Sequence, residues 1–285
     1  MRAELRELWR FRELLVSLVQ RELKIRYKNS FLGFFWSLIN PLVTVLVMTL
    51  VFKGIMLNPT PSFSSYILAA YLPFLFLQLA LLDSAQAILH YLPLVRKIYF
   101  PREILPLALI IGNFIHFLLA LAVFFVYQLV VFLIYPGFSP FHLSMLLLPV
   151  LLLISLAFVT GLGLIIAALN TFYEDVKYIV TVALYLLFFL SPIMYFSENV
   201  WFTATSTDRP WLYTAYHLNP IATLATAFRK VLVAPQPVFI DKETSVPPLP
   251  LDWAMLGFTA AFSFALLVFG YWVFNRMKWR FVERP

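Results

Sequence analysis

The chain has 285 residues, of which 62% are hydrophobic and 12% are charged, and its net charge at pH 7 is +7. Soluble domains are about 45–50% apolar and about 25% charged, so this composition excludes a soluble globular domain and requires lipid to cover the apolar surface. The absence of cysteine excludes a disulfide framework, a thiolate metal site and a thiol nucleophile. The basic residues lie outside the apolar runs, a pattern that favours phospholipid head groups and membrane topology over nucleic acid.

The N-terminal segment is charged throughout its first 30 residues, which excludes a secretory signal peptide. Residues 8–28 place apolar side chains on one helical face and charged side chains on the other, and this pattern predicts an amphipathic helix in the membrane interface. The apolar face comprises Leu8, Phe11, Leu15, Leu18 and Val19. From the residues alone, this helix is equally consistent with a topology anchor and with a substrate gate.

Six apolar runs approach the roughly 20 residues that a transmembrane helix needs. They cover residues 34–52, 66–89, 104–135, 143–169, 176–196 and 253–274. Pro73 and Gln78 in the second run predict a kink or a side that faces the bundle. Sixteen of the 21 Lys and Arg residues lie on the side of the two termini, so the positive-inside bias predicts that both termini are cytoplasmic.

Residues 197–251 are then expected outside. They contain a short apolar piece, residues 217–233, which is bounded by proline and is too short to span, so we expect it to be re-entrant or interfacial. The predicted fold is an all-α integral membrane protein with six transmembrane helices in one domain, residues 1–285. Its parts are a cytoplasmic amphipathic helix (1–31), spans one to five (32–196), an outer re-entrant or interfacial segment with a linker (197–251), and span six with a cytoplasmic tail (252–285).

Several kinds of chemistry are missing from the sequence. There is no G-x-x-x-x-G-K-[S/T] phosphate loop, so we expect ATP hydrolysis on a separate chain. The four histidines are isolated from one another, and we expect no catalytic residue, metal or cofactor in this chain. The spans hold almost no charge, which argues against a proton-coupled carrier or an ion pump. The pattern is typical of a passive conduit that another component drives.

Aromatic residues are abundant, with 30 Phe, 14 Tyr and 7 Trp. Most fit interfacial belts and core packing, and a carbohydrate path is the alternative for the dense groups in the first and fifth runs. The loop after the second run, residues 92–107 (LPLVRKIYFPREILPL), combines Arg96 and Lys97 with Tyr99 and Phe100. It fits a protein–protein contact and, equally, a membrane-surface loop held by basic residues.

Four segments together resemble one protein family. They are RELKIRYKNSFLGFFWSLINPL (21–42), LVRKIYFPREILPL (94–107), NTFYEDVKYIV (170–180) with SPIMY (191–195), and LNPIATLATAFRKVL (218–232). In this order, over nearly the whole chain, they resemble the permease subunits of type-2 ABC exporters for bacterial surface polysaccharides such as O-antigen and teichoic acid.

The resemblance implies a homodimer in the bacterial inner membrane, surrounded by membrane lipids and joined by two copies of a separate ATPase that binds ATP and Mg. The substrate would be a lipid-linked polysaccharide, and no nucleic acid is involved. The coupling helix would lie at about residues 94–102, with contact residues Arg96, Lys97, Tyr99, Phe100 and Arg102. The first and fifth spans would line the path through Phe34, Phe35, Trp36, Tyr185, Phe188 and Phe189.

The lipid carrier is expected to be a polyprenyl pyrophosphate. Its anionic head would first meet basic residues at the cytoplasmic interface, namely Arg21, Lys24, Arg26 and Lys28. Two alternatives stay open. A type-2 ABC exporter of lipids or drugs shares the six-span plan, whereas a multispan membrane enzyme on polyprenyl substrates would need paired acidic or His residues in one loop. Glu174 and Asp175 are the only adjacent acidic pair on the inner side.

Overall fold

The computed structural model describes residues 2–27, 35–60, 62–134, 142–240 and 244–282. This part of the chain is almost entirely helical, as predicted. Four helical stretches are long and apolar enough to cross a membrane, at Phe63–His90, Ile104–Leu133, Leu143–Phe172 and Trp253–Phe281. They correspond to α4 (Phe63–His90), α6 (Ile104–Ile134), η2 with α7 (Leu143–Leu147 and Leu148–Phe172), and α12 with the start of η3 (Trp253–Met277 and Lys278–Val282).

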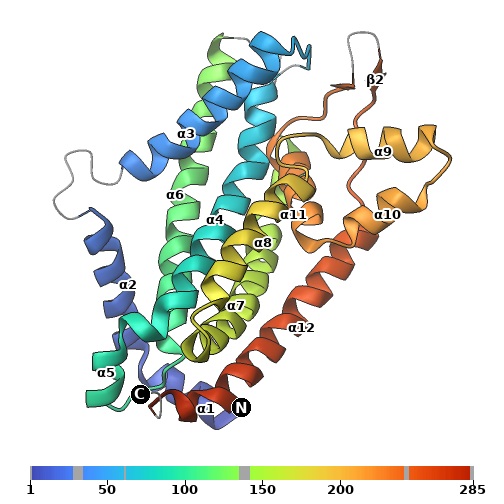
Figure 1. The fold of residues 1–285 in the computed structure, drawn as a ribbon. Helices are drawn as coiled ribbons and strands as arrows, with labels where there is room; N and C mark the ends of the chain where they lie inside the picture. The colour runs from blue at the N-terminus through green and yellow to red at the C-terminus, as the bar shows by residue number, and fades with distance from the viewer. Residues whose placement is uncertain (1, 28–34, 61, 135–141, 241–243, 283–285) are drawn as a thin grey trace.

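Helix α4 lies at the centre of the bundle. It packs against α6, α7, α11 (Pro220–Leu232) and α3 (Phe35–Thr49), and most of its residues are buried. Pro73 lies inside α4 and is itself buried, which agrees with the predicted bundle-facing side. Figure 1 shows α4, α6 and α7 running roughly side by side, with α12 inclined beside α7.

The first predicted span, residues 34–52, is helical from Phe35 to Ile55, whereas the fifth is a shorter helix than expected. Helix α3 has 15 residues and continues as a six-residue π-helical turn, η1 (Leu50–Ile55), while α8 (Val176–Leu190) has 15 residues. The 15 residues of α8 rise only about 22 Å, which is less than the thickness of about 30 Å of the hydrocarbon core of a bilayer. Helix α8 stops early because Ser191 precedes Pro192 and is extended, with φ −108° and ψ 152°. The boundary predicted at residue 196 is therefore wrong.

The N-terminal segment forms two helices instead of the single one predicted over residues 8–28. Helix α1 (Arg2–Arg10) ends at a turn at Phe11, and α2 (Arg12–Tyr27) follows. Leu18 and Val19, on the predicted apolar face, are buried in a cluster with residues of α4 and α6. Figure 1 shows α2 alongside the end of the bundle that contains this cluster, and α2 packs mainly on α6. Part of the apolar face therefore covers protein.

The segment between α8 and α12, predicted to face outward, forms a compact layer at one end of the bundle, which we call the outer layer after that prediction. It contains α9 (Ser197–Ser206), α10 (Trp211–His217), α11, and an antiparallel pair of short strands, β1 (Val238–Phe239) and β2 (Ser245–Val246). The linker after α11 thus carries a small hairpin. Helix α11 begins at Asn219, whose side chain caps it by accepting a hydrogen bond from the Ile221 N–H at 3.0 Å.

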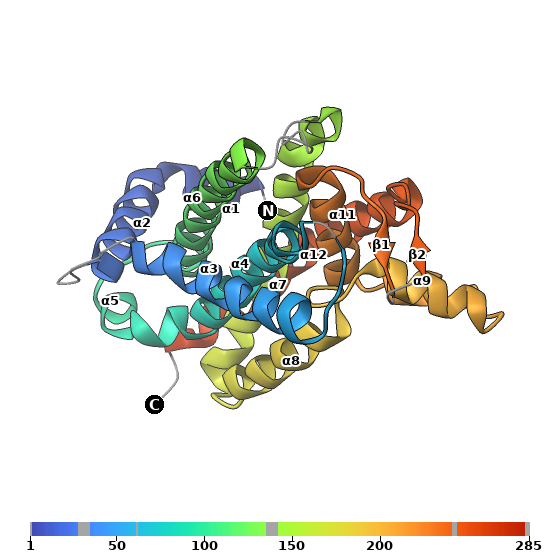
Figure 2. The ribbon, with the colours of Figure 1, turned by 90° about the horizontal axis from the view of Figure 1, so that it is seen from above.

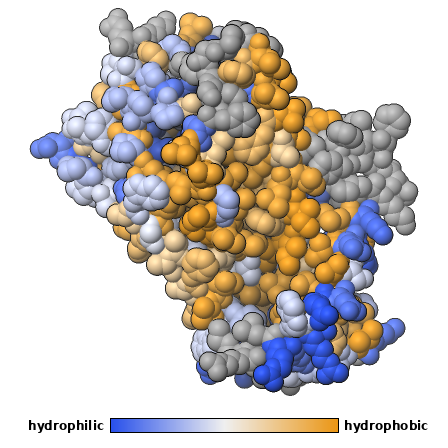
Figure 3. All heavy atoms as spheres, turned by 180° about the vertical axis from the view of Figure 1, so that it is seen from behind, coloured by the Kyte–Doolittle hydropathy of each residue, from blue (hydrophilic) through white to orange (hydrophobic). Residues whose placement is uncertain are grey.

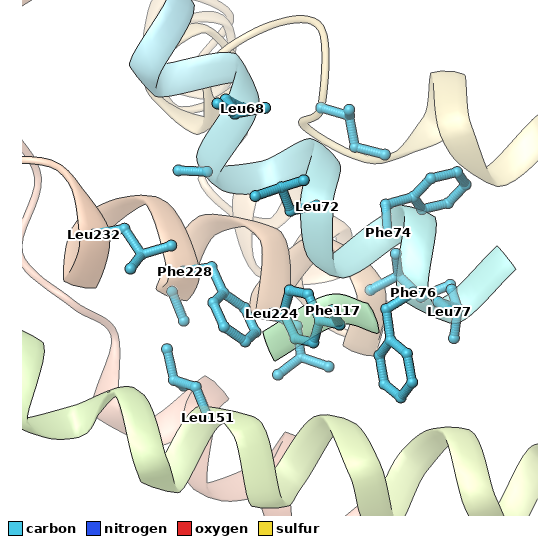
Figure 4. Packing of buried hydrophobic residues seen from close by; sticks show 14 of the residues in the cluster. Leu68, Leu72, Phe74, Phe76, Leu77, Phe117, Leu151, Leu224, Phe228 and Leu232 are labelled. Carbon is cyan, nitrogen blue, oxygen red and sulfur yellow. The ribbon is translucent and has the colours of Figure 1, made fainter. Parts of the chain in front are cut away.

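Helix α11 is buried among the long helices. Its Leu224, Phe228 and Leu232 meet the apolar face of α4, with Phe117 and Leu151 close by, as Figure 4 shows. The rings of Phe117 and Phe228 are 5.8 Å apart. This burial explains why so short an apolar helix is stable: its apolar side chains are covered by other helices.

Helices α7 and α12 approach each other more closely than side chains would allow. A Cβ atom on Gly161 would lie 2.6 Å from the backbone of Leu266, and one on Gly270 would overlap the backbone of Gly161. Small residues permit such contact between membrane helices. This glycine pair fixes α12 against α7, and Figure 1 shows α12 on the right of the bundle with α3 at the upper left.

Candidate functional site

The loop after α4 projects from the cytoplasmic end that the sequence predicts. It begins with the short helix α5 (Leu92–Lys97) and continues as extended chain to α6. Tyr99 and its neighbour Ile98 are 71% and 58% exposed, so both can contact another protein. Lys97 is also exposed, and Arg96 lies in α5 with its side chain outside the described part of the structure.

Phe100 differs from its expected role. It is only 5% exposed and belongs to the buried cluster that includes Val95 and Ile104. Its ring therefore anchors the loop to the bundle and is not free to contact a partner directly. Ile98 takes the exposed position next to Tyr99. The sequence pattern could not separate these roles, because the apolar residues Ile98, Tyr99 and Phe100 follow one another and nothing in their order shows which side chain is buried.

Both ends of the chain hold this loop. The Tyr99 hydroxyl donates a hydrogen bond to Glu7 Oε1 of α1 at 3.0 Å, and that bond is the main reason why the pKa of Tyr99 is raised. The Arg102 guanidinium donates to the backbone carbonyl of Lys278 at the start of η3. Burial lowers the pKa of Arg102, against the opposing effects of Glu103 and Tyr99. A hollow of about 260 Å³ lies between these groups.

A buried ion pair completes this junction. Lys278 Nζ lies 3.3 Å from Glu103 Oε1, and the two side chains are 7% and 1% exposed. We call Arg102, Glu103 and Lys278 the terminal clasp, because they join the start of α6 to the end of α12. Sequence reasoning missed Glu103 and Lys278, since no local pattern pairs residues so far apart in the chain. Two charges placed just beyond long apolar runs are the only signal available.

The basic residues of the N-terminal segment lie on α2. Arg21 and Lys24 are exposed, and the Arg21 guanidinium lies 5.2 Å from the centre of the Tyr91 ring. The Tyr91 hydroxyl donates a hydrogen bond to the carboxylate of Glu22, which lies next to Arg21 on α2. Arg26 is at the end of α2 with its side chain outside the described part, and Lys28 lies outside the described residues. The structure therefore places two of the four predicted cations on an exposed face.

Helices α3 and α8 each present an apolar face that no other described element covers. On α8, Tyr185 and Phe189 are 64% and 49% exposed and their rings are 5.2 Å apart. On α3, Val43, Leu46 and Val47 are similarly exposed. Figure 2 shows both helices on the same side of the molecule. Outward-facing aromatic and apolar side chains of this kind need lipid or another chain to cover them.

The other predicted lining residues divide into two groups. Phe188 is half-buried, with its ring 5.5 Å from Phe74 of α4, so its role in lining a path stays a prediction. Phe34 lies outside the described residues. Phe35 and Trp36 begin α3, with their side chains outside the described part.

Arg229 of α11 is a functional candidate that sequence reasoning passed over. It is 2% exposed, and its guanidinium donates hydrogen bonds to the carbonyls of Ile193 (2.6 Å), Tyr195 (2.7 Å) and Tyr66 (3.0 Å). The rings of Tyr66 and Phe196 flank it at 5.7 and 5.5 Å. Arg229 therefore ties the non-helical stretch after α8 to α4 and α11.

The described residues include no group of three or more His, Cys, Asp or Glu side chains that could hold a metal ion.

Comparison with known proteins identifies the family. The model of the ABC-2 type transporter family matches residues 13–233. The O-antigen export system permease protein RfbA of Myxococcus xanthus is 34% identical over 226 residues, which cover 79% of this chain and 82% of that protein. The protein of the same name from Klebsiella pneumoniae is 27% identical over 271 residues, covering 95% and 94% of the two chains. The chain is a multi-pass membrane protein that belongs to the ABC-2 type transporter family.

Proposed function

We propose that this chain is the channel-forming permease subunit of an ATP-driven exporter that moves a polyprenyl-pyrophosphate-linked polysaccharide of the O-antigen type across the inner membrane. The names of its relatives support the polysaccharide class. The observation that carries the channel role is the pair of uncovered apolar faces on α3 and α8, which lie on one side of the molecule.

A second copy of the chain would cover these faces. In the proposed homodimer, α3 and α8 of each subunit complete the first and fifth of six membrane passes. The two helices of one copy would face those of the other across a central path. Tyr185 and Phe189 would offer aromatic faces to the C–H surfaces of sugars, a contact that lets a polymer slide because it fixes no hydrogen bond.

The cytoplasmic end would bind two partners, the separate ATPase and the pyrophosphate head of the lipid carrier. With both termini cytoplasmic, Ile98 and Tyr99 would dock on a separate ATPase that carries ATP and Mg. Phe100 and the terminal clasp would make the loop move with α6 and α12 as one body. The pyrophosphate would meet Arg21 and Lys24 on α2, with Arg26 and Lys28 further along the chain. The outer hairpin formed by α9, α10 and α11 would re-enter the bundle from the opposite side.

Co-purification and cross-linking test this proposal. The tagged chain, expressed with the rest of its operon, is expected to retain a stoichiometric ATP-binding subunit. Cysteines at Tyr185 or Phe189 should form disulfides between two copies, because both side chains face outward on α8. Cysteine at Val150, which is exposed on α7, is the matched control and should not cross-link. A chain that purifies alone and cross-links equally at all three positions would contradict the proposal.

Substrate class is tested separately in proteoliposomes. The ATPase activity of the complex should rise with a polyprenyl-pyrophosphate-linked glycan and stay at its basal level with the same lipid lacking sugar. Stimulation by unrelated lipids or drugs alone would favour the general lipid or drug exporter.

A further inference from the structure

A cavity of about 200 Å³ lies at the outer end of the bundle, away from the path proposed above. Its walls come from α4, α9, the end of α11, η2, the start of α12 and the proline-rich linker before α12. Neither α3 nor α8 contributes to it. Two charged side chains, Glu198 and Lys230, line the cavity together with Tyr66 and Trp253.

Glu198 is a buried carboxylate with unused capacity to accept hydrogen bonds. It is 2% exposed, and among the described residues it accepts one hydrogen bond, from the Ser197 hydroxyl at 3.0 Å. The neighbouring Arg229 directs all its guanidinium nitrogens to backbone carbonyls, and Lys230 donates to the carbonyl of Pro250 at 2.9 Å. Arg229 and Lys230 both attract the Glu198 carboxylate electrostatically, but neither donates a hydrogen bond to it within the described part of the chain, so its remaining lone pairs can accept from a ligand that brings an N–H donor.

The surface beside the cavity is apolar and uncovered. Leu143 and Leu146 of η2 are 83% and 74% exposed, and Trp253 at the start of α12 is 62% exposed. These residues begin two of the long apolar helices, so they mark the level where the apolar band gives way to the polar outer layer. Figure 3 shows this transition between the orange band and the pale cap. Trp at such a boundary is typical of the interface between lipid tails and head groups.

We propose that this cavity binds the head group of a zwitterionic aminophospholipid. Its primary ammonium would donate to the Glu198 carboxylate, its phosphate would approach Lys230, and its acyl chains would lie against Leu143, Leu146 and Trp253. The outer leaflet as the source of the lipid rests on the orientation given under the proposed function. A phosphatidylcholine head has no N–H to donate, and phosphatidylglycerol has no cation, so both should bind less well.

Lipid retention measured by native mass spectrometry tests this assignment directly. The purified chain is exchanged into micelles with equimolar dioleoyl phosphatidylethanolamine and dioleoyl phosphatidylcholine. One charge-assisted hydrogen bond gives a preference of about tenfold or more for phosphatidylethanolamine. Glu198→Gln should bring this ratio close to one, and Lys230→Met should reduce retention of both lipids. Asp208→Asn and Arg209→Met change exposed charges of the same outer layer and should leave the ratio unchanged.

A lipid series keeps the test valid if a variant fails to fold. Mono- and dimethylated phosphatidylethanolamine remove N–H donors one at a time, so retention by the wild-type chain should fall stepwise towards that of phosphatidylcholine. Equal retention across the series, or displacement of lipid by a soluble oligosaccharide, would overturn the proposal and in the second case make the cavity a glycan site. The assay contains no ATPase and no exported glycan, so its failure leaves the export proposal standing, and failed export leaves this one standing.

Discussion

Replacing Arg229 by Met removes the side chain that connects the end of α8 to the rest of the bundle. Ile193 and Tyr195 lie in the non-helical stretch after α8, and their carbonyls accept hydrogen bonds from this guanidinium. Each buried carbonyl left without a donor costs about 1–3 kcal/mol, so the two together predict a loss of about 2–6 kcal/mol in the free energy of unfolding. The Tyr66 carbonyl lies within α4, where the helix supplies its own donor, and adds less.

Arg229→Lys provides a graded comparison. A lysine ammonium is a point charge without the planar fork of arginine, so it can reach one carbonyl well but cannot satisfy both in their present places. We expect a loss of stability between those of the wild type and the Met variant. Arg209→Met removes an exposed cation of the same outer layer and should change stability by less than about 0.5 kcal/mol.

The assay is unfolding in mixed micelles by titration with a denaturing detergent, followed by helicity. A local readout accompanies it: a cysteine introduced at exposed Phe189 should react with a maleimide at a changed rate in the Arg229 variants, because the end of α8 is released. If Arg229→Met unfolds within 1 kcal/mol of the wild type and the labelling rate is unchanged, other donors serve these carbonyls and the reasoning is refuted.

Three further predictions follow from buried groups elsewhere. Glu103→Gln or Lys278→Met should each destabilise the protein by about 3–5 kcal/mol because each leaves one buried charge unpaired, and the exchanged pair E103K with K278E should recover part of that loss in the same unfolding assay. Gly270→Ala should reduce the yield of folded protein in size-exclusion chromatography because its Cβ would overlap the α7 backbone, whereas Gly257→Ala, with nothing within 4 Å, should not. Burial lowers the pKa of His217 below 6.5, so the unfolded chain binds the proton before the folded chain does as the pH falls from neutrality. The melting temperature of the wild type should therefore fall as the pH is lowered below 6.5, and that of His217→Gln should fall less.

The long helices could be predicted from the sequence because hydrophobicity and length act locally. The apolar runs that predicted α6 and α12 end within a few residues of the ends of the observed helices. The early end of α8 was also encoded locally, in Ser191 before Pro192, but that signal lies inside an otherwise apolar run. The break at Phe11 has no such signal, since the helical pattern continues through it.

Partners distant in the chain could not be predicted in the same way. Glu103 and Lys278, or Arg229 and Ile193, meet only after the helices have packed. The inward turn of Phe100 has the same origin, because the buried cluster that receives it includes residues of α2, α4 and η3. Local sequence establishes which segments are apolar, and tertiary packing decides which side chain of a segment remains free for a partner.

The terminal clasp has a mechanical consequence for the proposed exporter. A partner that moves the exposed Tyr99 side chain displaces a loop whose next residue, Phe100, is buried in the bundle. The loop therefore cannot move far without moving the helices that Phe100 contacts. Arg102 and Glu103 connect it to Lys278, and α12 is in turn packed without side chains between it and α7 at Gly161 and Gly270. Tightly packed elements transmit displacement because they have little free volume. The stroke would therefore reach α7 and α12 together with α4 and α6, and the contacts of α4 with α3 and α8 would pass it on to those two helices.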